Sequence, residues 1–323
     1  MSASKAIKPC FVGFDTSNYT TSIAVSDFDG KVVANLKRPL PVKEGNRGLR
    51  QSDAVFEHTR NLPFLTEILK ELLATEGYAP IAVGASVTPR DAEGSYMPCF
   101  LSGKAAASSF SAALNIPMYE FSHQNGHIMA AMYSSGKAEL LTKTPFVAFH
   151  VSGGTTEALY VEPHRSGIKV TTVGETDDIN AGQLIDRVGV AMGLDFPCGR
   201  EMEKLAAAYE GKIYKHPVCV RDARCSLSGA ENIALKIYRD TEDKSAVAAF
   251  VFEFVKNTLA AMARDMEEKY GKTNILFAGG VMSNKLMRQY LSSRFTAYYA
   301  EPEFSADNGA GIALLCRAAY LNK

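Results

Sequence analysis

The stretch FVAFHVSGGTTEALYV, residues 146–161, has the pattern of two strands joined by a glycine turn. Its first five residues are mostly apolar and have the length and composition of a buried strand. Gly153 and Gly154 lack a Cβ, so the backbone can turn tightly there and approach another group closely. The residue pattern of a strand resumes at Ala158. The stretch predicts a turn that can aim N–H groups at a phosphate, although an ordinary hairpin explains these residues equally well.

A second copy of this pattern lies near the N-terminus. Residues 11–25, FVGFDTSNYTTSIAV, again run from an apolar strand through a hydroxyl-rich turn into an alternating strand. A third strand-like segment follows each copy, at residues 31–36 and 168–173. Because the copies begin at residues 11 and 146, each half is long enough to be a domain. The repeat predicts two similar α/β lobes with a nucleotide bound in the cleft between them.

The composition is that of a soluble globular protein. The chain has 323 residues, of which 46% are hydrophobic and 22% are charged, so it can bury a large core and form two domains. Lys+Arg and Asp+Glu are equal, at 35 each. No global electric field therefore draws the protein to nucleic acid or to an anionic membrane, and any contact with nucleic acid must be local.

The cysteines and the N-terminus lead us to expect a cytoplasmic protein. The six cysteines are scattered without a Cys-x-x-Cys pair, which argues against a zinc ribbon and a disulfide framework. The first residues lack the apolar core of a signal peptide. The most apolar long stretch, residues 246–263, is interrupted by Glu253 and Lys256. We therefore expect a buried helix there and no membrane association.

Two segments of the first half have the character of loops. Residues 37–53 are basic and contain prolines and glycines, so they are expected to be a loop, which is solvated or contacts a phosphate backbone. A helix should follow, because apolar residues recur at helical spacing from Val55 to Leu72. A buried strand at 81–87 leads into residues 88–95, which form either a ligand-binding loop or a surface turn.

The segment SHQNGHIMAAM, residues 122–132, carries a histidine pair at helical spacing. Ser122 is a good N-cap for the helix that the apolar run predicts. His123 and His127 are four residues apart, hence on one helix face, where neutral imidazoles can bind one metal ion. A structural role for both histidines is the alternative. Gln124 stands where a zincin has its catalytic Glu, which argues against a zinc peptidase.

The second half contains a further glycine turn and an acidic residue before its last helix. Residues 279–284, GGVMSN, follow a strand at 274–278 and form either a seat for adenine or ribose or a tight strand-to-helix connection. Asp307 precedes an apolar C-terminal helix. It can cap that helix, or it can be an oxygen ligand beside the two histidines. Residues 201–270 are expected to be mostly helical.

In this order, these segments resemble the tRNA threonylcarbamoyladenosine synthases, formerly called O-sialoglycoprotein endopeptidases or glycoproteases. The resemblance covers nearly the whole chain. Its most specific pieces are residues 123–127 (HQNGH), 151–154 (VSGG), 193–197 (GLDFP), 279–281 (GGV) and 307–309 (DNG).

The resemblance implies a fold and a division into lobes. The fold would be the duplicated α/β fold of actin, sugar kinases and chaperone ATPases, with two similar lobes around a nucleotide cleft. Residues 1–121 together with the C-terminal helix, 306–323, would form the N-terminal lobe. Residues 122–305 would form the C-terminal lobe, with a helical insertion at about 200–270.

The resemblance also implies a site and an activity. His123, His127 and Asp307 would bind one divalent metal ion, iron or zinc with magnesium as a further candidate, and His150 would be a fourth ligand. Asp15 and Ser17 would act in catalysis. The chain would transfer a threonylcarbamoyl group from threonylcarbamoyl-adenylate, which derives from ATP, to N6 of an adenosine in tRNA, with a same-fold paralogue and a small ATPase as partners. The adenylate would be held by His150, Val151, Ser152, Gly153, Gly154, Asp186, Gly199, Gly279, Gly280 and Asn284.

The chain departs from the family pattern on the acceptor side. Tyr19 and Thr20 replace an acidic pair at the first turn, and residues 89–94 (PRDAEG) replace a small Gly-Pro-Gly loop. Two alternatives to tRNA modification therefore stay open. One is a divergent paralogue that carbamoylates a small molecule, and the other is a non-catalytic nucleotide-binding partner or scaffold.

Overall fold

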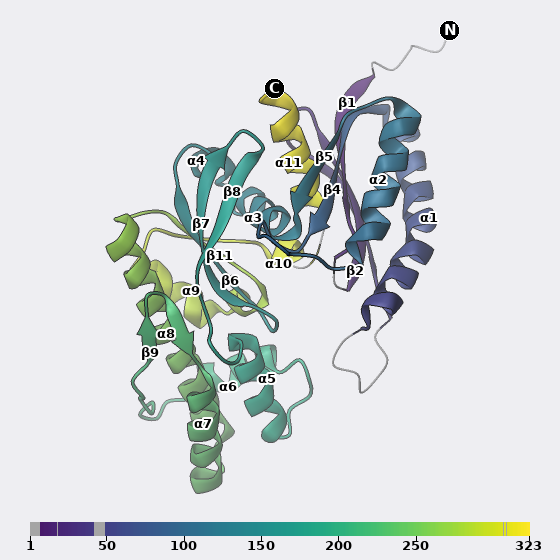
Figure 1. Ribbon diagram of the computed structural model, residues 1–323. Helices are drawn as coiled ribbons and strands as arrows, with labels where there is room; N and C mark the ends of the chain where they lie inside the picture. Colours follow the sequence, from purple (N-terminus) through teal and green to yellow (C-terminus); the bar gives the residue numbers. More distant parts are fainter. Residues whose placement is uncertain (1–6, 18, 42–48, 306, 308) are drawn as a thin grey trace. The chain divides into compact units, whose positions relative to one another are not determined.

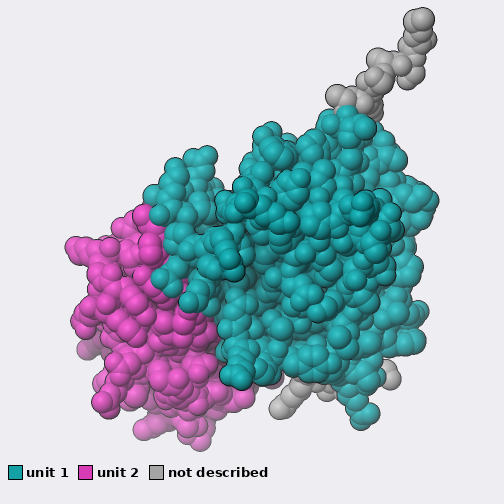
Figure 2. All heavy atoms as spheres, turned by 45° about the horizontal axis from the view of Figure 1, so that its top comes forward, with its two compact units in different colours: residues 1–143, 162–170, 303–323 teal, residues 144–161, 171–302 magenta. Residues whose placement is uncertain are grey.

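The computed structural model describes residues 7–17, 19–41, 49–305, 307 and 309–323, and its chain order is shown in Figure 1. The chain divides into two compact units, coloured in Figure 2. Unit 1 comprises Met1–Lys143, Glu162–Val170 and Glu303–Lys323, and unit 2 comprises Thr144–Val161 and Thr171–Pro302.

Unit 1 is built on a five-stranded sheet of order β3-β2-β1-β4-β5. The first three strands form an antiparallel meander, whereas β4 pairs parallel with β1 and β5 parallel with β4. The strands are β1 (Lys8–Asp15), β2 (Thr20–Asp27), β3 (Val32–Pro39), β4 (Tyr78–Thr88) and β5 (Met118–Ser122). The helices of this part of the chain are α1 (Gln51–Glu76), α2 (Phe100–Leu114), α3 (His123–Ser134), α4 (Ala138–Leu141), α10 (Pro302–Ser305) and α11 (Ala310–Leu321).

Unit 2 repeats this topology. Its five-stranded sheet has the order β12-β11-β6-β7-β8, in which β6 and β7 are antiparallel and β6, β11 and β12 are parallel. The strands are β6 (Phe146–Val151), β7 (Thr156–His164), β8 (Gly167–Glu175), β11 (Ile275–Ala278) and β12 (Ala297–Tyr299), with β9 (Cys219–Arg221) and β10 (Arg224–Ser226) in a separate pair. The helices are α5 (Ala181–Ala191), α6 (Gly199–Ala207), α7 (Ser228–Thr241), α8 (Lys244–Tyr270), the 3-10 turn η1 (Gly280–Ser283) and α9 (Lys285–Ser292).

The repeat confirms the predicted duplicated α/β fold. In each sheet a three-stranded meander is followed by two parallel strands. The first of these, β4 or β11, pairs with the opening strand of its sheet, β1 or β6, and the chain reaches it through a helical crossover. The predicted strand–turn–strand segments are β1–β2 and β6–β7. The sequence repeat therefore reflects a repeated topology.

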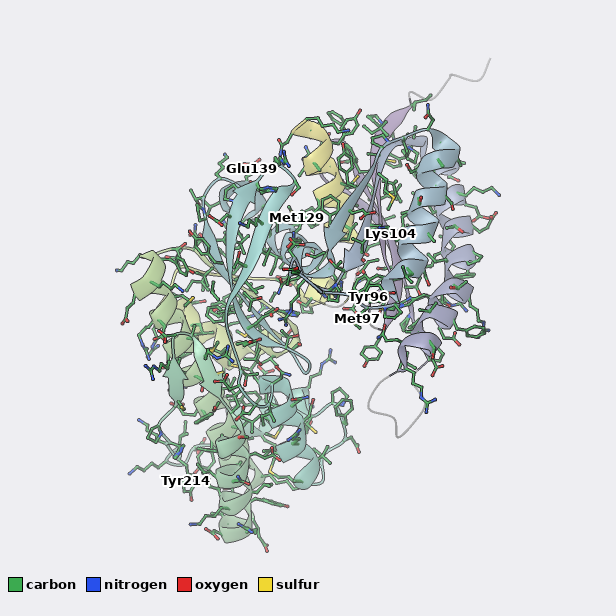
Figure 3. The ribbon with its side chains drawn as sticks, viewed as in Figure 1. Tyr96, Met97, Lys104, Met129, Glu139 and Tyr214 are labelled. Atoms are coloured by element: carbon green, nitrogen blue, oxygen red, sulfur yellow. The ribbon has the colours of Figure 1, made fainter. Side chains whose placement is uncertain are left out.

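Alternation along β1 explains why both faces of the first sheet are covered. Cys10, Val12 and Phe14 belong to the apolar core that includes Leu62, Leu65 and Leu69 of α1. The intervening Phe11 and Gly13 contact α11, where the Phe11 and Tyr320 ring centroids are 5.5 Å apart. Figure 1 shows α1 and α2 on one face of this sheet and α11 on the other. The ion pair of Lys104 on α2 with Glu120 on β5, 2.8 Å, lies near one edge (Figure 3).

The long helix α8 is the core helix of unit 2. It packs with β6 and β11, whose Phe149 and Phe277 rings stack at 5.2 Å between centroids. Among the described helices, α8 is the one with the length and apolar composition of a membrane span, and 83% of its apolar window is buried inside the protein. That burial is what a core helix requires, as expected from the charges of Glu253 and Lys256.

Three segments differ from their predicted structure. β3 continues to Pro39, so the predicted loop at 37–53 is shorter, and residues 42–48 of its basic part lie outside the described residues. The predicted helical insertion contains the β9–β10 pair, since Cys225 pairs with Val220. Residues 122–143, expected in the C-terminal lobe, belong to unit 1 because α3 packs against α11 and β4.

The packing of α3 on α11 depends on two glycines. A Cβ added to Gly311 would overlap the carbonyl oxygen of Gly126, and a Cβ on Gly126 would lie 2.8 Å from the Ile312 side chain. The two backbones can approach this closely only because neither residue has a side chain.

Gly311→Ala should therefore destabilise the protein by about 3 kcal/mol, because the overlap with backbone outweighs the roughly 1 kcal/mol that Ala contributes over Gly within a helix. The free energy of unfolding by urea measures the change. Gly229→Ala on α7, where an added Cβ meets no atom within 4 Å, is the matched control and should be neutral or slightly stabilising. Equal stability of the two variants would contradict the close contact.

Candidate metal centre and nucleotide-binding loops

The N-terminus of α3 places both predicted histidines on one face. Ser122 caps the helix, because its Oγ accepts a hydrogen bond of 3.2 Å from the Asn125 backbone N–H. His123 and His127 follow one turn apart, with ring centroids separated by 4.2 Å. The cap predicted at Ser122 therefore sets the start of the helix and, with it, the direction of both imidazoles.

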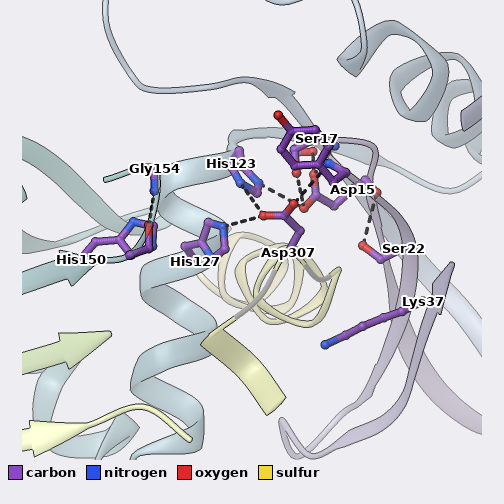
Figure 4. A network of polar contacts seen from close by, with 12 residues as sticks. Asp15, Ser17, Ser22, Lys37, His123, His127, His150, Gly154 and Asp307 are labelled. Carbon is purple, nitrogen blue, oxygen red and sulfur yellow. Dashed lines mark hydrogen bonds and ion pairs between the residues drawn. The ribbon is translucent and has the colours of Figure 1, made fainter. Parts of the chain in front are cut away.

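Asp307 lies beside these histidines, although it is distant in the sequence. Its Oδ1 is 3.2 Å from Nε2 of His127 and 3.5 Å from Nε2 of His123 (Figure 4). One ligand atom from each of the three residues lies within 4.8 Å of the others. The structure thus brings together three of the four predicted metal ligands, all within unit 1.

Behind His123 lies a second carboxylate, that of Asp15 at the end of β1. Asp15 is 1% exposed, and its Oδ2 is 3.1 Å from Nδ1 of His123. Ser17 donates to this carboxylate from both its backbone N–H and its Oγ, at 3.1 and 3.0 Å. The Oγ of Ser86 on β4 donates to Oδ1 at 2.5 Å. Both residues predicted to be catalytic, Asp15 and Ser17, are therefore buried in one polar network with a metal-ligand candidate.

The histidines and carboxylates shift one another's pKa values. Burial would lower the pKa of His123, but the charges and hydrogen bonds of Asp15 and Asp307 raise it to about 10. Burial would raise the pKa of Asp307, yet hydrogen bonds from both histidines hold it well below its usual range. The pKa of Asp15 is also lowered, because His123 outweighs the effect of burial. Without a metal, a protonated imidazole balances the carboxylates.

The donor set fits a divalent metal ion. Two imidazole nitrogens and one carboxylate oxygen are three protein ligands of the kind that catalytic zinc and non-haem iron sites use. The buried carboxylates need a positive charge, which a metal ion supplies as well as a proton does.

Two further groups flank the cluster. The Tyr19 N–H lies 3.5 Å from Oδ2 of Asp307, and Lys37 Nζ donates to the Glu303 carbonyl at 2.7 Å.

The charged loop after β4, residues 89–94, is attached to the same helix. The Gln124 N–H donates to the carbonyl of Pro89 at 3.0 Å, and Nδ2 of Asn125 donates to Oδ2 of Asp91 at 2.7 Å. Beyond these anchors, Tyr96 has 62% of its surface exposed (Figure 3). The charged residues of this loop are thus part of the surroundings of α3.

In unit 2 the two predicted glycine turns are neighbours. Because Ala278 pairs with His150, the turns that follow β6 and β11 emerge side by side from one sheet edge. Gly279 has a φ of +96°, and a Cβ there would overlap the Val151 carbonyl. By contrast, an added Cβ would meet no atom within 4 Å at Gly153, Gly154, Gly199 and Gly280. These glycines leave open space and exposed backbone into which a nucleotide can fit.

Two predicted nucleotide contacts also have structural partners. Oδ1 of Asp186 accepts from the backbone N–H of Cys198 at 2.8 Å, at the start of α6, and burial raises the pKa of Asp186. Asn284 caps α9, since its Oδ1 accepts from the Met287 N–H at 2.9 Å. Its buried Nδ2 has no hydrogen-bond partner among the described residues. That amide is therefore a donor available to a ligand.

His150 belongs to unit 2, so its predicted role as a fourth ligand of the centre in unit 1 stays a prediction. Within unit 2, its Nδ1 is 3.7 Å from Oε1 of Glu157, a buried carboxylate on β7.

The sequence does not single out several buried polar residues near the centre, of which Ser86 contacts Asp15 directly. Ser86 lies on β4 and His58 on α1, and both are fully buried. Nδ1 of His58 is 2.8 Å from Oγ1 of Thr21, which also accepts from Nδ2 of Asn61 at 3.1 Å. For His58 and Asn61 the sequence does contain a signal. Their helical spacing with Leu62 and Leu65 places two polar side chains on the apolar face of α1, where a buried polar group needs a partner.

The repeated sheets and the histidine–aspartate cluster define an α/β protein of the actin-like and sugar-kinase-like class with a candidate metal centre. Full-length HypF in its phosphate- and nucleotide-bound form is similar over 98% of this chain and 55% of its own, at 14% identity and a TM-score of 0.57. A ROK family protein from Streptococcus pneumoniae is similar over 97% of this chain and 99% of its own, at 15% identity and a TM-score of 0.54. At these identities the likeness shows the fold alone.

Sequence comparison shows the family. Residues 56–314 match the family described as tRNA N6-adenosine threonylcarbamoyltransferase. A protein of that name from Methanopyrus kandleri is 28% identical over 94% of this chain and 85% of its own length. Another, from Streptococcus pneumoniae, is 30% identical over 88% of this chain and 84% of its own. The chain belongs to the tRNA N6-adenosine threonylcarbamoyltransferase family, as the sequence motifs predict, and is a transferase of the acyltransferase type.

The buried His58 should make stability depend on pH. Burial lowers its pKa to about 4, against the opposing charges of Asp15 and Asp307. Between pH 6.5 and 4 the unfolded chain therefore binds more protons than the folded protein does. Above pH 6.5 His58 does not change the free energy of unfolding, and as the pH falls towards 4 it lowers that free energy by up to about 3 kcal/mol.

Urea unfolding at several pH values measures this dependence. His58→Asn, which can still accept from Thr21, should remove most of the slope in that window, whereas the same change at the exposed His164 should leave it unchanged. Identical slopes for wild type and His58→Asn would show that His58 does not titrate with a lowered pKa.

Proposed function

We propose that this protein transfers a threonylcarbamoyl group from threonylcarbamoyl-adenylate to N6 of an adenosine in tRNA, with the aid of a divalent metal ion. Family membership supports the reaction class, and the convergence of His123, His127 and Asp307 carries the proposal for this chain. A protein with only a scaffold role has no need for such a convergent set of metal ligands.

The metal ion would be held by Nε2 of both histidines and by the Asp307 carboxylate, and iron and zinc both suit these donors. When bound, it supplies a Lewis acid that polarises a carbonyl or phosphoryl oxygen. The attacking group is the amine of the acceptor, so the chain itself need not provide a nucleophile. AMP is the leaving group.

The adenylate would lie against the glycine turns of unit 2. The open backbone at Gly153 and Gly154 leaves room for phosphate oxygens, although the Gly154 N–H donates to Oγ of Ser152 at 3.2 Å within the turn. The free Nδ2 of Asn284 can donate to the nucleoside. The remaining oxygen of Asp186 can accept from a ribose hydroxyl while Oδ1 stays bonded to Cys198.

This chain departs from the family pattern described above on the acceptor side. Tyr19, whose backbone lies beside Asp307, stands where the family has a carboxylate. The loop from Pro89 to Gly94 adds charges next to α3. These two changes favour, as a second candidate, a paralogue that carbamoylates a small molecule. For the first candidate, a same-fold paralogue and a small ATPase would be cytoplasmic partners.

Metal binding tests the centre directly. The purified protein should bind about one equivalent of Zn²⁺ or Fe²⁺ in calorimetry or by elemental analysis after dialysis. His127→Ala and Asp307→Ala should each reduce the affinity strongly because each removes one of three protein ligands. The exposed His164→Ala serves as the control. Unchanged binding by either ligand variant would remove this cluster from the proposal.

Activity tests the acceptor. The assay contains threonine, bicarbonate, ATP, the adenylate-forming enzyme and tRNA, and mass spectrometry of digested nucleosides detects threonylcarbamoyladenosine. We expect slow modification by the protein alone and faster modification with the same-fold partner and the ATPase, since the carboxylates replaced by Tyr19 and Thr20 no longer contribute electrostatically. Asp307→Ala should be inactive in both conditions.

Efficient modification without partners would show that the acidic pair is dispensable. If no product forms with every partner present, while consumption of the adenylate depends on an added small-molecule acceptor, the second candidate replaces the first.

A further inference from the structure

Asp15 occupies an unusual position for a residue expected to act in catalysis. It is 1% exposed, at the carboxyl end of β1, so almost none of its surface can contact a substrate. Its Oδ1 accepts from the Ser17 N–H and from Ser86 Oγ. Its Oδ2 accepts from Ser17 Oγ and faces Nδ1 of His123 at 3.1 Å. These four contacts use the hydrogen-bonding capacity of the carboxylate.

The direction of the His123 ring follows from this arrangement. A carboxylate oxygen beside Nδ1 favours a proton on that nitrogen, which leaves Nε2 as the donor atom for a metal. In the structure Nε2 of His123 does face Asp307, at 3.5 Å. A ring flipped about its Cβ–Cγ bond would turn Cε1 to the centre, and the other tautomer would point the Nε2 proton at it, so neither would offer a lone pair there.

We infer that Asp15 is a positioning residue, which holds His123 with Nδ1 protonated and Nε2 directed at the metal centre, and that it does not touch the substrate. The role is built into the sheet, because Ser17 fixes the carboxylate from the turn after β1 and Ser86 fixes it from β4. The inference rests on the proposed function only where it concerns metal affinity. The hydrogen bond itself can be tested in protein without metal.

The first test uses metal-free protein labelled with ¹⁵N-histidine. Because His123 is buried, its Nδ1–H should exchange slowly and give a resolved ring N–H resonance in the wild type. Asp15→Asn should shift or abolish that resonance. The matched control is Ser22→Ala, because the buried Ser22 Oγ donates to the Asp15 main-chain carbonyl, 3.2 Å, and not to its carboxylate. An unchanged resonance in Asp15→Asn would overturn the inference, whatever the protein binds.

The second test measures Zn²⁺ affinity beside the urea unfolding transition. Asp15→Asn should bind Zn²⁺ roughly 10- to 100-fold more weakly than the wild type, as is usual when the group that orients a metal-binding histidine is changed. Asp15→Glu should recover part of the loss because it restores the carboxylate. Ser22→Ala should bind as the wild type does. A purely structural role would lower the stability of Asp15→Asn and leave the Zn²⁺ affinity of the folded fraction unchanged.

One outcome separates this inference from the proposed function. A wild type that binds no Zn²⁺ or Fe²⁺ would contradict the metal centre, and the histidine resonance would still decide the role of Asp15. Should Asp15→Asn fail to fold, Ser86→Ala loosens the same carboxylate by removing one donor. We then expect Ser86→Ala to weaken Zn²⁺ binding by a smaller factor, and wild-type affinity in a folded Ser86→Ala protein would count against the inference.

Discussion

The contact between the backbones of α3 and α11 is the constraint on which the candidate metal centre depends. Gly126 and Gly311 allow the two helices to approach so closely that an added Cβ would overlap a carbonyl oxygen. His123 and His127 are carried by one of these helices, and Asp307 precedes the other. Because the helices are held at this short distance, side chains of ordinary length can meet at one point.

Burial explains why the centre needs a positive charge. The side chains of Asp15 and Asp307 are 1% and 18% exposed, so water screens their charges weakly. Without a metal, the rise in the pKa of His123 to about 10 supplies a cation in the same place. A positive charge on the imidazole, or on a bound metal ion, would offset the carboxylates on both sides of His123. This arrangement suits a metal ion better than it suits a histidine with only a packing role.

The two units share one topology but differ at the end of the first strand of each sheet. Both sheets have a meander followed by two parallel strands, and in both the first strand ends in a polar turn. In unit 1 Asp15 ends β1 and Ser17 lies in the turn after it, and their hydrogen bonds point inward and support His123. In unit 2 the turn after β6 contains Gly153 and Gly154, which leave open space. The difference lies in the side chains, because a carboxylate can organise a buried network whereas glycines expose backbone donors.

The sequence by itself determined the features that depend on neighbouring residues. These are the two strand–turn–strand units, the cap at Ser122, the spacing of His123 and His127 and the family motifs, since turns, caps and helix faces follow from local chemistry. Only the tertiary structure decided that Asp307 lies 3.2 Å from a histidine 180 positions earlier and that Asp15 is buried behind His123. It also showed that His58 and Ser86 belong to the surroundings of the centre. Burial and long-range contacts depend on how whole elements pack, which no short stretch of sequence contains.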